Sequence, residues 1–155
     1  MIQRIQSLYL LLTTLFSVLF LNGIIIKFVT LTNEALYLTF TGINRFSEVA
    51  GTENVEKLIL LSILLILVPV ISLITVFLYK KRKLQLKFAV ALITLIIVKI
   101  LTVLYYSNYV INEYAAELTP RMNLVLPFLS LIFAFLAFRG IKKDDNLIRS
   151  YDRLR

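Results

Sequence analysis

Four long apolar stretches dominate the 155-residue chain, at about 8–26, 58–79, 88–106 and 122–138. A helix rises about 1.5 Å per residue and the hydrocarbon core of a bilayer is about 30 Å thick, so about 20 residues span it. Backbone groups in lipid must be hydrogen-bonded within the spanning segment, which favours helices. The pattern therefore predicts an all-α membrane protein with four transmembrane helices in a single domain over residues 1–155.

Composition agrees with a membrane location. Hydrophobic residues make up 59% of the chain, more than the surface of a soluble domain accommodates. The first apolar stretch ends in LNGIIIKFV without a small-x-small cleavage site, so we expect a retained helix. The net charge of +8 could suggest nucleic acid. However, the basic residues cluster beside the apolar stretches, which is typical of membrane topology and not of a nucleic-acid groove.

The charge distribution predicts the orientation. Most of the 17 basic residues lie on one side of the predicted membrane, and these are Arg4, Lys80, Lys81, Arg82, Lys83, Lys87, Arg139, Lys142, Lys143, Arg149, Arg153 and Arg155. The opposite side carries Lys27, Arg45, Lys57 and Arg121. Because loops rich in Lys and Arg stay in the cytoplasm, both termini and the middle loop are predicted to be cytoplasmic.

Two outer connections, 27–57 and 107–121, join the predicted helices on the other side. In the first, residues 36–41 (LYLTFT) alternate between apolar and polar. This period of two favours a strand, in a short β-hairpin with TNEA near its turn. Two strands alone are marginally stable, so the hairpin would need support from helix ends or a partner.

The tail, 139–155, differs from the rest of the chain. Leu147, Ile148, Tyr151 and Leu154 recur at helical spacing, which predicts a cytoplasmic amphipathic helix. Such a helix could dock in a groove of a partner or lie along the inner leaflet. Alternatively, the tail is a basic anchor that only fixes the topology.

Lys99 interrupts the third apolar stretch. Pro69 lacks the N–H that would bond the carbonyl of Leu65, and helical arithmetic places that carbonyl near the depth of Lys99. Ser62 and Ser130 lie at similar levels. We therefore expect an intramembrane polar contact of Lys99 with Ser62, Ser130 and the freed carbonyl. Pairing with an acidic residue of another protein is the alternative, and snorkelling into lipid would exclude both.

The residue inventory argues against an enzyme. The chain has no cysteine and no histidine, and none of its nine acidic residues lies in an apolar stretch, so no metal or cofactor is expected. A Ser–Lys dyad of Lys99 with Ser62 or Ser130 is the one conceivable catalytic pair. Hydroxyls in membrane helices usually bond to their own turn or to a neighbouring helix, and no small-molecule substrate is identifiable.

The two ends of the chain, MIQRIQSLYLLL and DDNLIRSYDRLR, carry a resemblance. They resemble a family of small, uncharacterised four-helix membrane proteins of Bacteroidetes, with four variable apolar helices between the ends. The resemblance implies a bacterial inner-membrane location, with the amino-terminal segment packed on the tail and Arg4 near an Asp. The residues that match the family pattern are Gln3, Arg4, Gln6, Asp145, Arg149, Ser150, Asp152, Arg153 and Arg155.

These observations lead to a functional expectation. The chain is predicted to be a non-catalytic accessory subunit of a larger inner-membrane complex, such as one for protein export, membrane insertion or envelope biogenesis. The expected partner-binding residues are Gln3, Arg4, Gln6, Leu147, Arg149, Asp152, Arg153 and Arg155. The alternative is an oligomeric transporter or channel component for a small solute, with Lys99 in the path.

Overall fold

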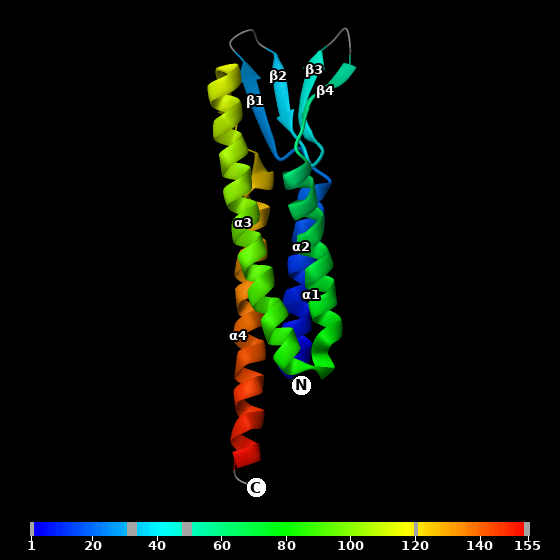
Figure 1. The fold of residues 1–155 in the computed structure, drawn as a ribbon, viewed down its shortest axis with the longest axis vertical. Coiled ribbons are helices and arrows are strands. Elements are labelled where there is room, and N and C mark those ends of the chain that lie inside the picture. The colour runs from blue at the N-terminus through cyan, green and yellow to red at the C-terminus, as the bar shows by residue number, and fades with distance from the viewer. Residues whose placement is uncertain (1, 31–33, 48–50, 120, 154–155) are drawn as a thin grey trace.

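The chain folds as a bundle of four helices with a β-sheet at one end (Figure 1). The computed structural model describes residues 2–30, 34–47, 51–119 and 121–153, and the side chains of 2–4, 46–47, 51–53 and 148–153 lie outside this description. The helices are α1 (Ile2–Leu21), α2 (Ile59–Phe77), α3 (Arg82–Tyr114) and α4 (Val125–Arg153). Two 3₁₀ turns, η1 (Leu78–Lys80) and η2 (Met122–Leu124), precede α3 and α4. Helices α1 and α3 each pack against both α2 and α4.

The sheet is antiparallel throughout and has five strands in the order β4-β3-β2-β1-β5. The strands are β1 (Ile26–Thr30), β2 (Ala35–Leu38), β3 (Gly42–Ser47), β4 (Gly51–Lys57) and β5 (Ala116–Thr119). The connection between α1 and α2 supplies four strands, and the connection between α3 and α4 supplies β5. Segments far apart in the sequence therefore form one sheet.

This sheet changes the sequence-based prediction. The predicted hairpin corresponds to β1 and β2, which pair with Ile26 opposite Leu38, and three further strands extend it. The support that two strands need comes from within the chain. The all-α expectation is therefore incomplete, whereas the four predicted helices are confirmed.

The helix bounds also differ from the apolar stretches. Helix α1 ends at Leu21, because β1 begins only five residues later. Helix α3 has 33 residues and continues to Tyr114, where Ala115 adopts a left-handed conformation. The tail is not a separate helix, since α4 runs without a break from Val125 to Arg153. No proline interrupts it after Pro127, so the helix continues beyond the apolar stretch.

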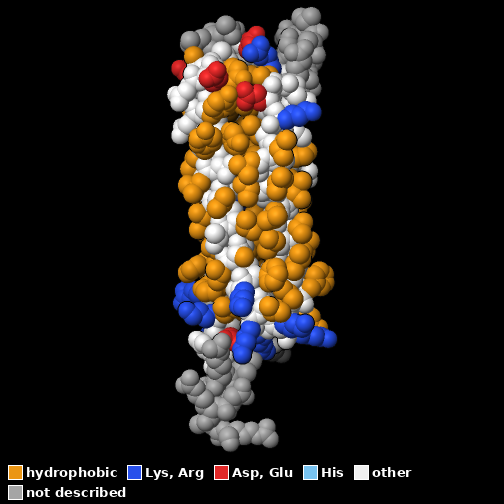
Figure 2. Space-filling model, viewed as in Figure 1, with side chains coloured by type: hydrophobic (Ala, Val, Ile, Leu, Met, Phe, Trp, Pro, Cys, Tyr) orange, Lys and Arg blue, Asp and Glu red, His pale blue; other side chains and the backbone are white. Residues whose placement is uncertain are grey.

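Three helical segments are long and apolar enough to cross a membrane, namely Ile59–Lys80, Arg82–Tyr114 and Met122–Leu147. The apolar part of α1, Ile5–Leu21, is shorter. Figure 2 shows apolar side chains over the length of the bundle and basic side chains gathered at the end opposite the sheet. A lipid-facing surface of this kind exposes large hydrophobic residues, among them Ile59, Phe77 and Leu101.

Two buried clusters form the core. One lies where the bundle meets the sheet and joins Phe20 of α1 and Val110 of α3 to Phe28 and Leu38. The other fills the opposite half of the bundle, and its members are Leu10, Val68, Ala89, Leu92, Ile96, Ala134, Ala137 and Ile141. Lipid removes most of the hydrophobic drive for helix association, so close packing at small residues and interhelical hydrogen bonds matter more. The Ser72 hydroxyl, for example, donates to the Leu10 carbonyl of α1 at 2.9 Å.

Side-chain hydrogen bonds fasten the sheet to the helices. The Tyr109 hydroxyl of α3 donates to Oε1 of Glu56 in β4 at 3.1 Å. The Asn123 amide of η2 donates to the carbonyl of Ile24, just before β1, at 2.8 Å. The sheet region is thus tied to α3 at β4 and to η2 at the segment that leads into β1.

Candidate functional site

The first candidate site joins the two ends of the chain. The Gln6 amide of α1 donates to Oδ2 of Asp144 in α4 at 2.7 Å, and the two residues are only 6% and 7% exposed. Gly140 permits this approach, because a Cβ at that position would lie 2.8 Å from Cγ of Gln6. A buried hydrogen bond to a carboxylate is among the stronger ones in proteins. The amino-terminal segment and the first part of the tail are therefore packed together.

The family resemblance implied this packing, but with Arg4 near an Asp of the tail. The pair that the structure describes is Gln6 with Asp144. The Arg4 side chain lies outside the described residues, as do those of Gln3, Arg149, Asp152, Arg153 and Arg155. Of the expected partner-binding residues, Gln6 is therefore buried within the chain and Leu147 is exposed.

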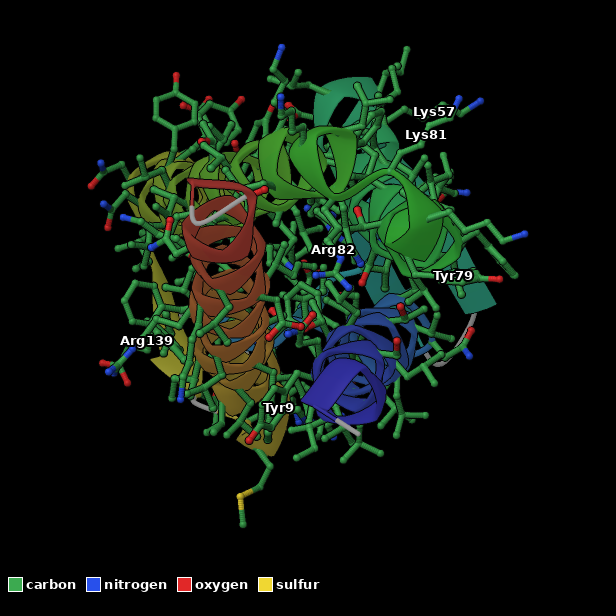
Figure 3. All side chains as sticks on the ribbon, turned by 90° about the horizontal axis from the view of Figure 1, so that it is seen from below. Tyr9, Lys57, Tyr79, Lys81, Arg82 and Arg139 are labelled. Carbon is green, nitrogen blue, oxygen red and sulfur yellow. The ribbon has the colours of Figure 1, made fainter. Side chains whose placement is uncertain are left out.

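A small polar cavity adjoins the Gln6–Asp144 pair at the same end of the bundle. Its volume of about 10 Å³ suffices for about one water molecule. The lining residues are Gln6, Ser7, Tyr79, Arg82, Gln85, Ile141 and Asp144. Seen from this end in Figure 3, Arg82 points toward the space between the helices, whereas Arg139 points outward. Beside the cavity, the Gln85 amide of α3 donates to the Thr75 carbonyl of α2 at 3.2 Å, which links these two helices.

Lys99 forms the second candidate site, in the middle of the bundle. Its side chain is 1% exposed, and its Nζ lies 5.3 Å from the centre of the Phe20 ring. The aromatic face offers the ammonium a cation–π contact. Among the described residues, no hydrogen bond or ion pair to Lys99 is formed. Lys99 thus faces the interior of the bundle and not lipid.

The expected polar partners of Lys99 are engaged elsewhere. The Ser62 hydroxyl lies 2.6 Å from the Phe40 carbonyl and 3.1 Å from the Leu58 carbonyl, at the sheet end of α2. The Ser130 hydroxyl donates to the Pro127 carbonyl at 2.7 Å. Both serines bond to backbone close by, as hydroxyls in helices commonly do. The structure therefore does not bring these three residues together, and the Leu65 carbonyl accepts no hydrogen bond from Lys99 either.

The difference arises from the way in which the depth of Lys99 in the membrane was predicted by counting helical residues. That count took the third helix to end near Tyr106, whereas α3 continues to Tyr114. Lys99 consequently lies near the middle of α3, and its side chain extends to the end of α1 and not to α2. The cation–π contact with Phe20 joins residues on different helices, and no spacing in the sequence indicates it, so it was not predicted.

These sites are poor in catalytic chemistry. Within the part of the chain that the structure describes, no group of three or more His, Cys, Asp or Glu residues could hold a metal ion. The Ser130 hydroxyl faces a carbonyl acceptor, and no bond links it to the Lys99 ammonium, so the two do not form a nucleophile–base pair. What the arrangement can do is join α1 to α4 where the amino-terminal segment meets the first part of the tail.

A four-helix bundle in which three helices are long and apolar enough to cross a membrane, with a sheet at one end, defines a class of small helical membrane proteins. The chain belongs to the family described as a domain of unknown function, DUF4293, which matches residues 2–154. No curated protein and no solved structure matches it. The expected membership in an uncharacterised family is thereby confirmed, and the match includes both ends of the chain. The bacterial group stays a prediction.

Proposed function

We propose that the chain is a non-catalytic accessory subunit of a larger inner-membrane complex, docking partner proteins through its cytoplasmic termini. In this arrangement four helices cross the membrane, both termini lie inside, and the sheet lies outside. The class of complex expected is one for protein export, membrane insertion or envelope biogenesis. The gathering of basic side chains at the end opposite the sheet supports the orientation (Figure 2).

One observation carries the proposal. Helix α4 does not end with the bundle but projects beyond the other helices as a single helix to Arg153 (Figure 1). The Gln6–Asp144 bond fixes the base of this projection to α1. An isolated helix is only marginally stable, so a partner that covers the apolar face predicted from the sequence of the tail would supply burial.

The test is purification of the full chain in mild detergent from cells that express it at its natural level. We expect stoichiometric subunits to co-purify. The double substitution Arg149→Gln and Arg153→Gln should reduce their recovery at least about tenfold, if each lost charge-assisted contact costs about 1.5–3 kcal/mol. The matched control, Lys81→Gln with Lys83→Gln, removes the same charge from the η1–α3 connection and should leave recovery unchanged. A clean monomer or homo-oligomer would overturn the proposal.

A second candidate function is favoured by the unpaired ammonium of Lys99, which is buried without a hydrogen bond among the described residues. Intramembrane cations often mark solute paths, so an oligomeric transporter or channel component would place Lys99 in the path. The close contact with Phe20 argues against an open path in one copy of the chain. Solute flux into proteoliposomes that is lost in Lys99→Met would support this alternative.

A further inference from the structure

The feature that carries a further inference is a basic hollow on the outer face of α4. It is lined by Arg139, Lys142, Lys143, Asn146 and Leu147, and its volume is about 550 Å³. The hollow is open along the side of the helix, so a ligand there would be covered only in part. The positions i, i+3, i+4, i+7 and i+8 fall on one side of the helix, so three cations and an amide converge on the same space.

The cations of this hollow are available to a ligand. Arg139, Lys142 and Lys143 form no ion pair with any residue that the structure describes. Lys142 lies over the Phe138 ring, with Nζ 5.9 Å from its centre, which holds the charge beside the helix. The acidic residue Asp144 turns to the opposite side of α4, where it bonds to Gln6. The hollow therefore has a strong preference for an anion.

An apolar stripe leads directly into the hollow. Phe128, Ile132 and Phe135 are exposed by 52%, 54% and 51% and precede Arg139 on the same side of α4. Their spacing of three to four residues repeats that of the basic residues. From Phe128 to Arg139 the helix rises about 16 Å, about half the thickness of the hydrocarbon core. The stripe therefore matches the depth of one leaflet and ends where headgroups begin.

We infer that this face of α4 is a binding site for an anionic phospholipid. Its phosphate lies among Arg139, Lys142 and Lys143, and an acyl chain lies along Phe128, Ile132 and Phe135. Basic pockets beside membrane helices are known to hold anionic headgroups. The continuous apolar stripe favours a lipid over a free phosphate, which would use only the hollow. The inference is independent of the proposed docking function, because it requires neither a protein partner nor a particular orientation.

The experiment titrates the purified full chain, in neutral detergent, with phosphatidylglycerol and counts bound lipids by native mass spectrometry. Substituting Arg139, Lys142 and Lys143 together by Gln should weaken binding about 100-fold, because each basic residue near a membrane surface contributes about fivefold. The matched control replaces Lys81, Lys83 and Lys87 by Gln, which removes equal charge from the η1–α3 connection and the first turns of α3. It should leave phosphatidylglycerol binding unchanged.

The possible outcomes are distinguishable. Equal losses in the two triple variants, or no loss in either, would overturn the site. Phosphatidylcholine that binds as tightly as phosphatidylglycerol would also overturn it, and glycerol phosphate that binds as tightly as the lipid would show a free-phosphate site instead. A second measurement needs no variant: phosphatidylglycerol with a photoreactive acyl chain should crosslink to the 128–135 segment. Crosslinks confined to other helices would contradict the proposal.

Discussion

At the scale of single residues, Lys99 is the most unusual position in the chain. Insertion of a lysine at the centre of a membrane helix costs about 2.5–3.5 kcal/mol. The cation–π contact with Phe20 offsets about 0.5–2 kcal/mol of this. Because no hydrogen bond among the described residues adds to that contact, Lys99 lowers the stability of the bundle and does not hold it together.

We therefore predict that Lys99→Met will not destabilise the protein. Replacing a buried ion pair by well-packed apolar residues is often neutral or stabilising by about 1–4 kcal/mol, and among the described residues Lys99 has no ion-pair partner to lose. Thermal unfolding in detergent should show an unchanged or higher midpoint. The control is Leu101→Met, at an exposed position on the same helix. A loss of more than about 2 kcal/mol in Lys99→Met would show that a polar partner binds the ammonium.

The Gln6–Asp144 pair has the opposite character, because both of its members are satisfied. Gln6→Leu should destabilise the protein by about 1.5–3 kcal/mol, since it leaves the buried Asp144 carboxylate without its donor. The double substitution Gln6→Leu with Asp144→Leu should recover part of that loss. Thermal unfolding of the two single variants and the double variant measures the coupling. Additive effects would show that the two side chains do not interact.

Lys99 and the Gln6–Asp144 pair show how much of a site can be predicted from the sequence. The ends of the chain were singled out by their resemblance to a family, and Gln6 was among the residues that match its pattern. Its partner could not be identified, because the tail offers several acidic residues and the choice depends on the helix face that turns toward α1. The interior position of Lys99 was among the alternatives considered. Its ring partner was not, since it depends on where α1 and α3 cross.

At the scale of elements, the helices were predictable and most of the sheet was not. Apolar runs of about 20 residues have one stable solution in lipid, so the four helices follow from the sequence. Residues 36–41 (LYLTFT) alternate between apolar and polar, and β2 (Ala35–Leu38) includes the first half of this run. By contrast, β4 reads GTENVEK and β5 reads AELT, which combine short length with residues that are rare in strands. They become strands because β3 and β1 present edges to them.

Gly42 is the residue on which the β3–β4 pairing depends. Its φ of +148° is readily adopted only by glycine, and an added Cβ would collide with the Glu56 carbonyl oxygen. We predict that Gly42→Ala costs about 1–3 kcal/mol and loosens β4. Hydrogen exchange should show faster exchange of β4 amides, with α1 unaffected. Asn54→Ala, at an exposed position of β4, is the control, and equal protection in both variants would contradict the prediction.

At the scale of the whole molecule, the charges separate along the long axis. On the face shown in Figure 2, basic side chains gather at the end with the chain termini, and acidic ones lie near the sheet. The same asymmetry was read from the sequence alone, because the counts depend only on where the apolar stretches begin and end. A labelling experiment on the protein in a membrane tests whether this charge asymmetry sets the orientation.

The absence of cysteine makes this measurement direct. Single variants Thr41→Cys, in the sheet region, and Lys83→Cys, near the start of α3, provide one label on each side. In intact spheroplasts, a membrane-impermeant maleimide should label Thr41→Cys, and Lys83→Cys should react only after permeabilisation. Both variants should react in detergent, which is the control for accessibility. The reverse pattern would show the opposite orientation.

The position of β5 imposes an order on the synthesis of the protein. Strand β1 is made early, yet one of its two neighbours is supplied by residues 116–119, after the whole of α3. Until that segment arrives, one edge of β1 has no partner and can pair with other chains. A chain that stalls before residue 116 therefore carries an unfinished edge that proteases and chaperones can recognise. The fifth strand thus delays completion of the sheet until the whole of α3 has been made.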